Sequence, residues 1–128
     1  MSDGDQKTIL LLDDSPANIK VLNSALKDHY RTKIATNGIK ALEIASRDPQ
    51  PDLILLDIMM PEMNGFEVCS RLKERPETNA IPVIFLTGKT SDEDREKGLS
   101  LGAVGFLDKP INVSLVVECL QEQLGTKT

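Results

Sequence analysis

The chain has 128 residues, of which 40% are hydrophobic and 27% charged, values that indicate one compact globular domain and exclude a disordered, collagen-like or disulfide-stapled chain. Fifteen basic against twenty acidic side chains give a formal charge of −5, which disfavours nucleic acid and anionic membranes as the main partner. No apolar run approaches the roughly 20 residues of a membrane-spanning helix, and the acidic N-terminus is unlike a secretory signal, so we expect a cytoplasmic location.

Short apolar runs along the chain predict the strands of a sheet. Four of them lie at 9–12, 53–56, 83–86 and 104–107, whereas a fifth at 33–35 is shorter and more polar. Continuous apolar runs, rather than alternating apolar and polar residues, are typical of parallel strands that are covered on both faces. The polar segment therefore fits an edge position in the sheet.

The segments between these runs carry helix signals. The first follows Ser15-Pro16, a helix cap with proline at the first helical position, and repeats apolar residues at Ile19, Leu22 and Leu26, the spacing of one helix face. Four further helices are expected, marked by Ala41, Leu42 and Ala45 after Asn37-Gly38; by Phe66, Cys69 and Leu72 after Asn64-Gly65, ending before Pro76; by a segment from Ser91 to about Gly102; and by a segment from Asn112 to Leu124.

Five strands alternating with five helices define the expected fold. This alternation predicts an α/β fold with a doubly wound, five-stranded parallel sheet and helices on both faces. We expect a single domain over residues 1–128, with a core of about 7–124 and loose ends. Ligands of such sheets bind beyond the carboxyl ends of the strands, so functional side chains are expected at that edge.

Polar side chains are expected at this edge, because each of them closely follows one of the apolar runs. They are Asp13 and Asp14, Asp57, Thr87 and Lys109. Three carboxylates on neighbouring loops repel one another unless a cation neutralises them, and such oxygen ligands suit Mg2+ or Mn2+. Beside that ion, the Thr87 hydroxyl and the Lys109 ammonium could hold a phosphoryl group. The chain lacks the glycine-rich loops of nucleotide sites, so a simpler phosphoryl donor is expected.

Four motifs carry a resemblance to a known family. They are ILLLDDS at 9–15, DLILLDIMMPEMNGFEV at 52–68, PVIFLTG at 82–88 and GAVGFLDKP at 102–110. In this combination the sequence resembles the receiver domains of response regulators in two-component signalling. The resemblance implies that the sheet is of the flavodoxin-like type, with strand order 2-1-3-4-5. The resemblance implies a phosphoacceptor that takes a phosphoryl group from a partner phosphohistidine with Mg2+, and then changes the surface that controls partner or output binding.

The resemblance also implies a role for each acid. Asp57 would be the phosphoacceptor, and Asp13, Asp14 and Asp57 would hold Mg2+ together with the backbone carbonyl of Met59. Physical chemistry is consistent with this assignment, because an ionised carboxylate can attack phosphorus without a general base when the transferring charge is neutralised. Positioning and electrostatics would then be the protein's whole contribution.

Further positions take their expected roles from the same resemblance. Thr87 and Lys109 would contact the phosphoryl oxygens, and the bond between Lys109 and Pro110 would be cis. Phe106 lies at the family's switch position, so Thr87 and Phe106 together would report phosphorylation to the surface of the fourth helix and fifth strand. That surface is also where a homodimer is expected.

The remaining chemically active side chains are expected to lie outside the site. His29 is predicted at the surface, just past the first helix, so the phosphoryl donor must be another protein, a sensor histidine kinase or a histidine phosphotransfer protein. Cys69 and Cys119 lack metal-ligand spacing and are predicted to be buried thiols on helices that cover opposite faces of the sheet, too far apart for a disulfide.

Three alternatives fit parts of the pattern. Taken singly, each polar residue at the edge suits a structural role in a turn or helix start. A Mg2+-dependent phosphatase or phosphotransferase for small molecules also uses an aspartyl phosphate, but usually with a cap and a second acid where this chain has Met59. A module that binds partners without phosphorylation would not need the complete set. A signalling module, rather than an enzyme, is therefore the expected class.

Overall fold

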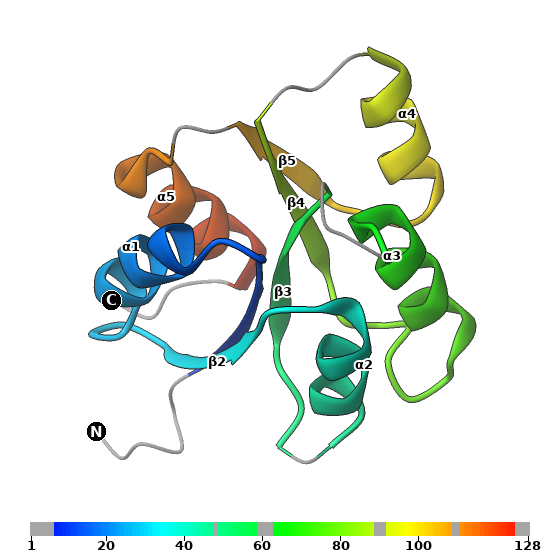
Figure 1. Cartoon of the computed structure of the whole chain (residues 1–128), viewed down its shortest axis with the longest axis horizontal. Coiled ribbons are helices and arrows are strands. Elements are labelled where there is room, and N and C mark those ends of the chain that lie inside the picture. Colours follow the sequence, from blue (N-terminus) through cyan, green and yellow to red (C-terminus); the bar gives the residue numbers. More distant parts are fainter. Residues whose placement is uncertain (1–6, 48, 59–62, 89–91, 109–110, 125–128) are drawn as a thin grey trace.

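One parallel sheet of five strands forms the centre of the protein (Figure 1). The computed structural model describes residues 7–47, 49–58, 63–88, 92–108 and 111–124. The strand order is β2-β1-β3-β4-β5, and every pair of neighbours is parallel, which confirms the predicted fold. The strands are β1 (Thr8–Leu12), β2 (Arg31–Ala35), β3 (Leu53–Asp57), β4 (Val83–Thr87) and β5 (Gly105–Asp108).

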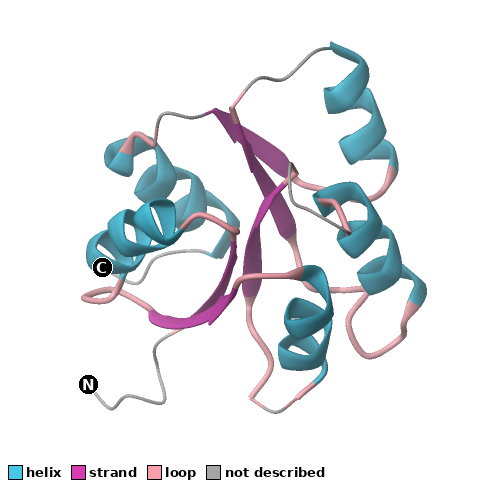
Figure 2. Ribbon diagram, in the orientation of Figure 1, coloured by secondary structure: helices cyan, strands magenta, loops and turns pink. Residues whose placement is uncertain are grey.

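Helices cover both faces of this sheet. Helices α1 and α5 lie on one face, and α2, α3 and α4 lie on the other (Figures 1 and 2). This two-sided arrangement follows from right-handed crossovers between parallel strands. The helices are α1 (Pro16–Leu26), α2 (Gly38–Ser46), α3 (Gly65–Glu74), α4 (Asp92–Ser100) and α5 (Val113–Leu124).

The apolar core is divided by the sheet into two layers. Ile9 and Leu11 of β1 pack with α1 and α5, whereas Leu10 and Leu12 pack with α2 and α3, because successive side chains of a strand point to opposite faces. All residues of β1, β3 and β4 are buried, and the two edge strands are partly exposed. The uninterrupted apolar runs are therefore central strands covered on both faces, and the more polar segment is an edge strand, as the sequence predicts.

Asparagine and serine side chains start three of the helices. The Ser15 hydroxyl accepts from the backbone N–H of Asn18, with Pro16 at the first helical position, as expected. Asn37 caps α2 and Asn64 caps α3 in the same way. These caps satisfy N–H groups that have no partner within the helix.

Gly65 fixes the start of α3 against the end of β3. A Cβ atom at this position would lie 2.3 Å from the carbonyl oxygen of Asp57, and the Gly65 N–H donates to the carbonyl oxygen of Ile58 at 2.9 Å. Only glycine permits this approach. The backbone that carries Asp57 is therefore anchored on the helix that follows it.

Three predicted details need correction or fall outside the described residues. β5 begins at Gly105 rather than at Val104, because the paired register with β4 starts at Ile84 and Gly105 and the Val104 side chain is 42% exposed rather than packed in the core. α4 is described from Asp92, so the predicted start at Ser91 lies outside the described residues. Cys119 is half-buried rather than buried, because it only borders the core layer beside α1.

Among the described residues, the structure has no helix that is both long enough and apolar enough to cross a membrane.

Candidate functional site

Three carboxylates meet at the carboxyl end of the sheet. Asp13 and Asp14 follow β1, and Asp57 is the last residue of the neighbouring strand β3. One oxygen from each lies within 4.8 Å of the others. Asp13 is 2% and Asp57 3% exposed, whereas Asp14 is exposed. The three acids that the sequence places at this edge are thus brought together.

Hydrogen bonds within its own loop orient the Asp13 carboxylate. The backbone N–H of Ser15 donates to Asp13 Oδ1 at 2.9 Å, and the side-chain amide of Asn18 donates to Asp13 Oδ2 at 3.2 Å. The backbone N–H of Asp13 donates to the carbonyl oxygen of Ala35 at 3.3 Å. Sequence analysis missed Asn18; its signal is an amide side chain one helical turn past the cap, on the side of α1 nearest the acids.

Thr87 ends β4 at the same edge of the sheet. It is 1% exposed, and it pairs with Asp108, the last residue of β5. Thr87 follows Leu86, which pairs with Asp57, so the hydroxyl-bearing residue stands one position further along the edge. Met59, Lys109 and Pro110 lie outside the described residues, so neither the expected carbonyl ligand, the ammonium group nor the cis bond is described.

The donor set of this group fits a hard divalent cation. Carboxylate oxygens are the ligands that Mg2+ and Mn2+ prefer, and two of the three acids are buried, where like charges are screened least. Asp14 remains exposed, so the group has access to solvent. An ion at this position would offset the mutual repulsion of the carboxylates.

An aromatic ladder of Phe66, Phe85 and Phe106 lies beneath α4. The Phe66 and Phe85 rings meet edge to face at 5.3 Å between centroids, and the Phe85 and Phe106 rings are 5.4 Å apart at 32°. Thr87 is two residues after Phe85 on the same strand, and strand alternation therefore places both on the same face. Phe106 is the half-buried member of the ladder; it packs against the edge of the core and is not enclosed in it.

Helix α4 contacts the ladder through a glycine and two cations. A Cβ atom on Gly98 would lie 2.3 Å from the Phe106 ring, so the helix backbone rests directly on that ring. The Arg95 guanidinium lies 5.5 Å from the centroid of Phe106 and the Lys97 ammonium 4.8 Å from that of Phe66. Arg95 also pairs with Asp108 at 3.6 Å. The sequence signal for this contact is a glycine within a highly charged helix.

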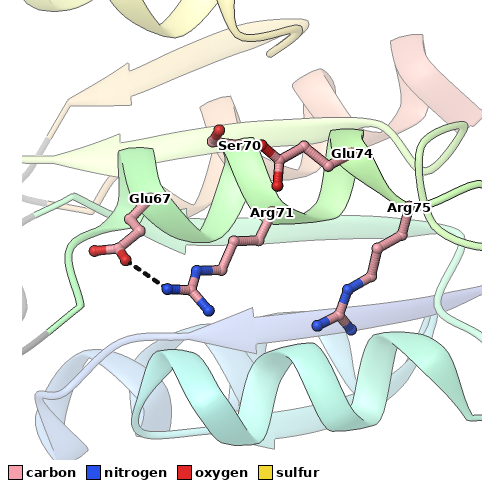
Figure 3. A pocket seen from close by; sticks show the side chains of 5 residues that line it. All are labelled: Glu67, Ser70, Arg71, Glu74 and Arg75. Carbon is pink, nitrogen blue, oxygen red and sulfur yellow. Dashed lines mark hydrogen bonds and ion pairs between the residues drawn. The ribbon is translucent and has the colours of Figure 1, made fainter.

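A solvated groove on α3 contains none of the three acids. Its volume is about 380 Å³. Figure 3 shows Arg71 beside Glu67, which it contacts at 2.9 Å, and Arg75 donates to the Ser46 hydroxyl of α2 at 3.4 Å. The basic and acidic side chains of the groove balance one another, and we assign no site to it. The lining residues are Glu67, Ser70, Arg71, Glu74 and Arg75.

The histidine and the thiols lie away from the acids. His29 is exposed after α1, as predicted. Cys69 is buried in the core layer of α3 and Cys119 borders the opposite layer, which confirms that their helices cover different faces. Burial raises the pKa of both thiols, an effect that Lys73 partly offsets for Cys69 and Glu122 reinforces for Cys119. Both cysteines are free.

Known proteins resemble this chain in both sequence and structure. The family model described as the response regulator receiver domain matches residues 9–121. The polar-differentiation response regulator DivK of Brucella anthropi is 35% identical over 120 residues, which cover 93% of this chain and 97% of that protein.

Longer relatives share the same segment. A probable cyclic di-GMP phosphodiesterase of Vibrio cholerae is 47% identical over 99% of this chain. The response regulator PleD of Caulobacter vibrioides is 47% identical over 81% of it. The chain spans only 29% and 23% of the length of these two proteins.

Solved structures have the same fold. The chemotaxis protein CheY4 of Vibrio cholerae is 31% identical, with a TM-score of 0.86 over 91% of this chain and 98% of that one. The receiver domain of the sensor histidine kinase PA1611 from Pseudomonas aeruginosa is 30% identical, with a TM-score of 0.85 over 94% of this chain and 99% of that one. That structure is described as having a magnesium ion coordinated in the active site cleft.

Proposed function

The chain belongs to the response-regulator receiver domain family of two-component signalling, and on that premise we propose that Asp57 accepts a phosphoryl group from a partner's phosphohistidine. The observation that carries this proposal is the meeting of Asp13, Asp14 and Asp57 within 4.8 Å at the carboxyl end of the sheet. Asp57 is buried at the end of a strand whose backbone is anchored on Gly65, so its carboxylate is held in place for attack.

The phosphoryl transfer would proceed by displacement at phosphorus. A carboxylate oxygen of Asp57 forms the new O–P bond while the P–N bond of the phosphohistidine breaks, and its electron pair returns to the imidazole nitrogen. An ionised carboxylate has no proton to lose, so no general base is needed. The Thr87 hydroxyl and the Lys109 ammonium would stabilise the phosphoryl oxygens, the former as a hydrogen-bond donor and the latter as a charge.

The metal ligands in this proposal are the three acids and the Met59 carbonyl. When bound, Mg2+ or Mn2+ would neutralise charge on the transferring phosphoryl oxygens. Asp14 is the exposed member of the group, so its exchange for asparagine removes a ligand charge with little effect on packing. We expect Asp14→Asn to weaken Mg2+ binding in a calorimetric titration while metal-free stability rises or holds, because like-charge repulsion is relieved. Unchanged Mg2+ binding would contradict this role.

The proposed output involves Thr87 and Phe106. A phosphoryl oxygen on Asp57 would draw the Thr87 hydroxyl toward it, and the Phe106 ring would turn into the space released. Three features support this: Thr87 shares a strand face with Phe85, Phe85 contacts Phe106 at 5.4 Å, and α4 rests on the Phe106 ring through Gly98. A change in ring position would therefore move α4, and a ligand that favours one of two states shifts their populations.

We place the chain in the cytoplasm as a single receiver domain, residues 1–128, and as a signalling module that promotes only its own phosphorylation and dephosphorylation. Its partners would be a sensor histidine kinase or a histidine phosphotransfer protein. The surface of α4 and β5, where Leu99 of α4 and Val104 just before β5 are exposed, would bind the output partner or a second copy of the chain.

Intact-mass measurement after incubation with acetyl phosphate and Mg2+ tests the phosphoacceptor. We expect a gain of one phosphoryl mass in the parent chain and none in Asp57→Asn. Asp28→Asn makes the same chemical change at an exposed position after α1 and should keep the gain. A gain that survives in Asp57→Asn, or one that never occurs in the parent chain, rejects the proposal.

Nuclear magnetic resonance with beryllofluoride, a phosphoryl mimic, tests the output pathway separately. We expect shifts over residues 92–107 in the parent chain and much smaller shifts in Thr87→Ala. Thr36→Ala removes an exposed threonine after β2 and should behave like the parent. Equal shifts in the parent chain and in Thr87→Ala would show that the coupling does not pass through Thr87.

A further inference from the structure

We propose that Asn18 is a positioning residue for the cation site, because its side-chain amide holds the Asp13 carboxylate in the orientation that the acidic group requires. This inference rests on the proposed function of the same site. It assigns a role to a residue of α1 that is itself neither a cation ligand nor a phosphoryl ligand in that proposal.

A closed circuit of hydrogen bonds joins Asn18 to Asp13. The Ser15 N–H donates to Asp13 Oδ1 at 2.9 Å, the Asn18 N–H donates to Ser15 Oγ at 3.4 Å, and the Asn18 side-chain amide donates to Asp13 Oδ2 at 3.2 Å. Both oxygens of the carboxylate are therefore held by the same short segment. A carboxylate held at two points cannot turn about its terminal torsion without breaking one of these bonds.

The position of Asn18 explains why this side chain can reach the acid. It is the third residue of α1, after Pro16, and Pro16 and the Ser15 cap fix the direction in which the helix leaves the loop. Asn18 is half-buried, so its amide bond to a buried carboxylate is partly shielded from competing water. Because an ionised carboxylate only accepts hydrogen bonds, the amide NH2 is the end of Asn18 that faces Asp13.

An amide suits this position for an electrostatic reason. It donates to the carboxylate without adding net charge, so the three acids keep the full negative charge that attracts a divalent cation. A lysine or arginine there would compete with the cation, and an aspartate would have no donor for Asp13. Hydrogen bonds to ligating carboxylates orient them, and loss of such a partner typically weakens metal binding about 10- to 100-fold.

Calorimetric titration with Mg2+ alone tests the inference. We expect Asn18→Ala to raise the dissociation constant for Mg2+ at least about tenfold. The matched control is Asn23→Ala, which removes an asparagine from the same helix whose side chain accepts from the Thr32 hydroxyl of β2. The control should bind Mg2+ as the parent chain does, although both variants lose one hydrogen bond and should show similar losses of metal-free melting temperature.

Side-chain amide resonances of the parent chain give a second measurement that needs no variant. The Asn18 amide signals should move as Mg2+ is added, with the dissociation constant found by calorimetry, while the Asn23 amide signals stay in place.

Two results would overturn the inference: Mg2+ affinity in Asn18→Ala equal to that of the parent chain, or Asn18 amide signals that do not respond to Mg2+. Failure of the proposed cation site would differ from both, because the parent chain itself would then bind no Mg2+.

Discussion

Helices α3 and α4 cover the same face of the sheet after neighbouring strands, yet they are attached in different ways. α3 buries five residues, Gly65, Phe66, Val68, Cys69 and Leu72. In α4, every residue of which the structure describes, only Gly98 is buried. Hydrophobic burial therefore fixes α3, whereas the contacts of α4 include one close backbone approach, two cation–ring contacts and the ion pair between Arg95 and Asp108.

One face of the sheet therefore carries a firmly attached helix, α3, and a weakly attached one, α4. Burial contributes about 1.5–3 kcal/mol for each large apolar side chain, and a cation–ring contact at an exposed site contributes only about 0.5–1 kcal/mol. α3 holds the backbone of Asp57 through Gly65, so its attachment preserves the acidic group. Segments with few buried apolar contacts open at low free-energy cost, and α4 is such a segment.

The largest effect is expected from shortening a buried side chain of α3. Leu72→Ala leaves a cavity beside β3 and β4 and should lower the free energy of unfolding by about 2–5 kcal/mol. Leu99→Ala makes the same change on α4, where the side chain is 55% exposed, and should cost less than about 0.5 kcal/mol. Urea unfolding measures both, and similar losses would remove the contrast between the two helices.

Gly98→Ala tests the close approach of α4. The new Cβ would lie 2.3 Å from the Phe106 ring and 3.0 Å from that of Phe85, so the helix or the ring must shift at a cost of about 1–3 kcal/mol. The better helix propensity of alanine offsets about 1 kcal/mol of this. Faster hydrogen exchange in α4, with exchange in α3 unchanged, would identify the shift.

Gly105→Ala is the matched control on β5. Its Cβ would meet Ile84 at 3.9 Å, an ordinary contact, so stability should hold or rise slightly. If both glycine variants behave alike, the Phe106 ring does not limit the position of α4.

A smaller effect is expected from Arg95→Ala. This change removes the cation over Phe106 and the pair with Asp108, whose side chain is 63% exposed. Solvent weakens such a pair, so we expect a loss of about 0.5–1 kcal/mol, together with altered ring resonances of Phe106. Glu93→Ala, at an exposed position of the same helix, should leave those resonances in place. Unaltered Phe106 resonances in Arg95→Ala would rule out the contact.

The smallest expected effect is a loss of stability at alkaline pH. Burial raises the pKa of the Cys69 thiol above its ordinary value of 9.0, so the unfolded thiol loses its proton before the folded one. The unfolding free energy should therefore fall between about pH 8 and pH 10, and less so in Cys69→Ala. An equal fall in both proteins would exclude Cys69 as its source.

Thiol labelling should reach half-buried Cys119 first.

Most of the fold could be predicted because its signals are local. The strands β1, β3 and β4 are buried on both faces. Each of them therefore needs a continuous run of mainly apolar residues, and such a run can be recognised in the sequence without knowing its neighbours in space. α4 differs, because its attachment depends on rings from α3, β4 and β5 that no local pattern connects. The start of β5 differs from the prediction for a related reason: Val104 is apolar but exposed, and an apolar residue type alone does not tell an exposed position from a buried one.

The candidate site was predicted as far as topology determines it. Parallel strands bring their carboxyl ends to one edge, so Asp13, Asp14 and Asp57 had to meet once the strand order was known. The contacts of Asn18 and Gly65 were missed because both depend on how a loop leads into a helix. The order of elements along the chain predicts which residues share an edge of the sheet, but it does not predict which side chains there form hydrogen bonds with one another.

The strand order also has a consequence for the time at which each part of the sheet is made. β3 joins β1, β4 joins β3, and β5 joins β4, so after β2 the sheet grows at one edge in the order of synthesis. A chain in which β5 has not yet paired would present β4 as an open edge, with backbone groups ready to pair with another chain. The docking of β5 covers β4 and leaves a strand of only four residues as the new edge of the sheet, and a very short edge strand is a poor template for pairing with another chain.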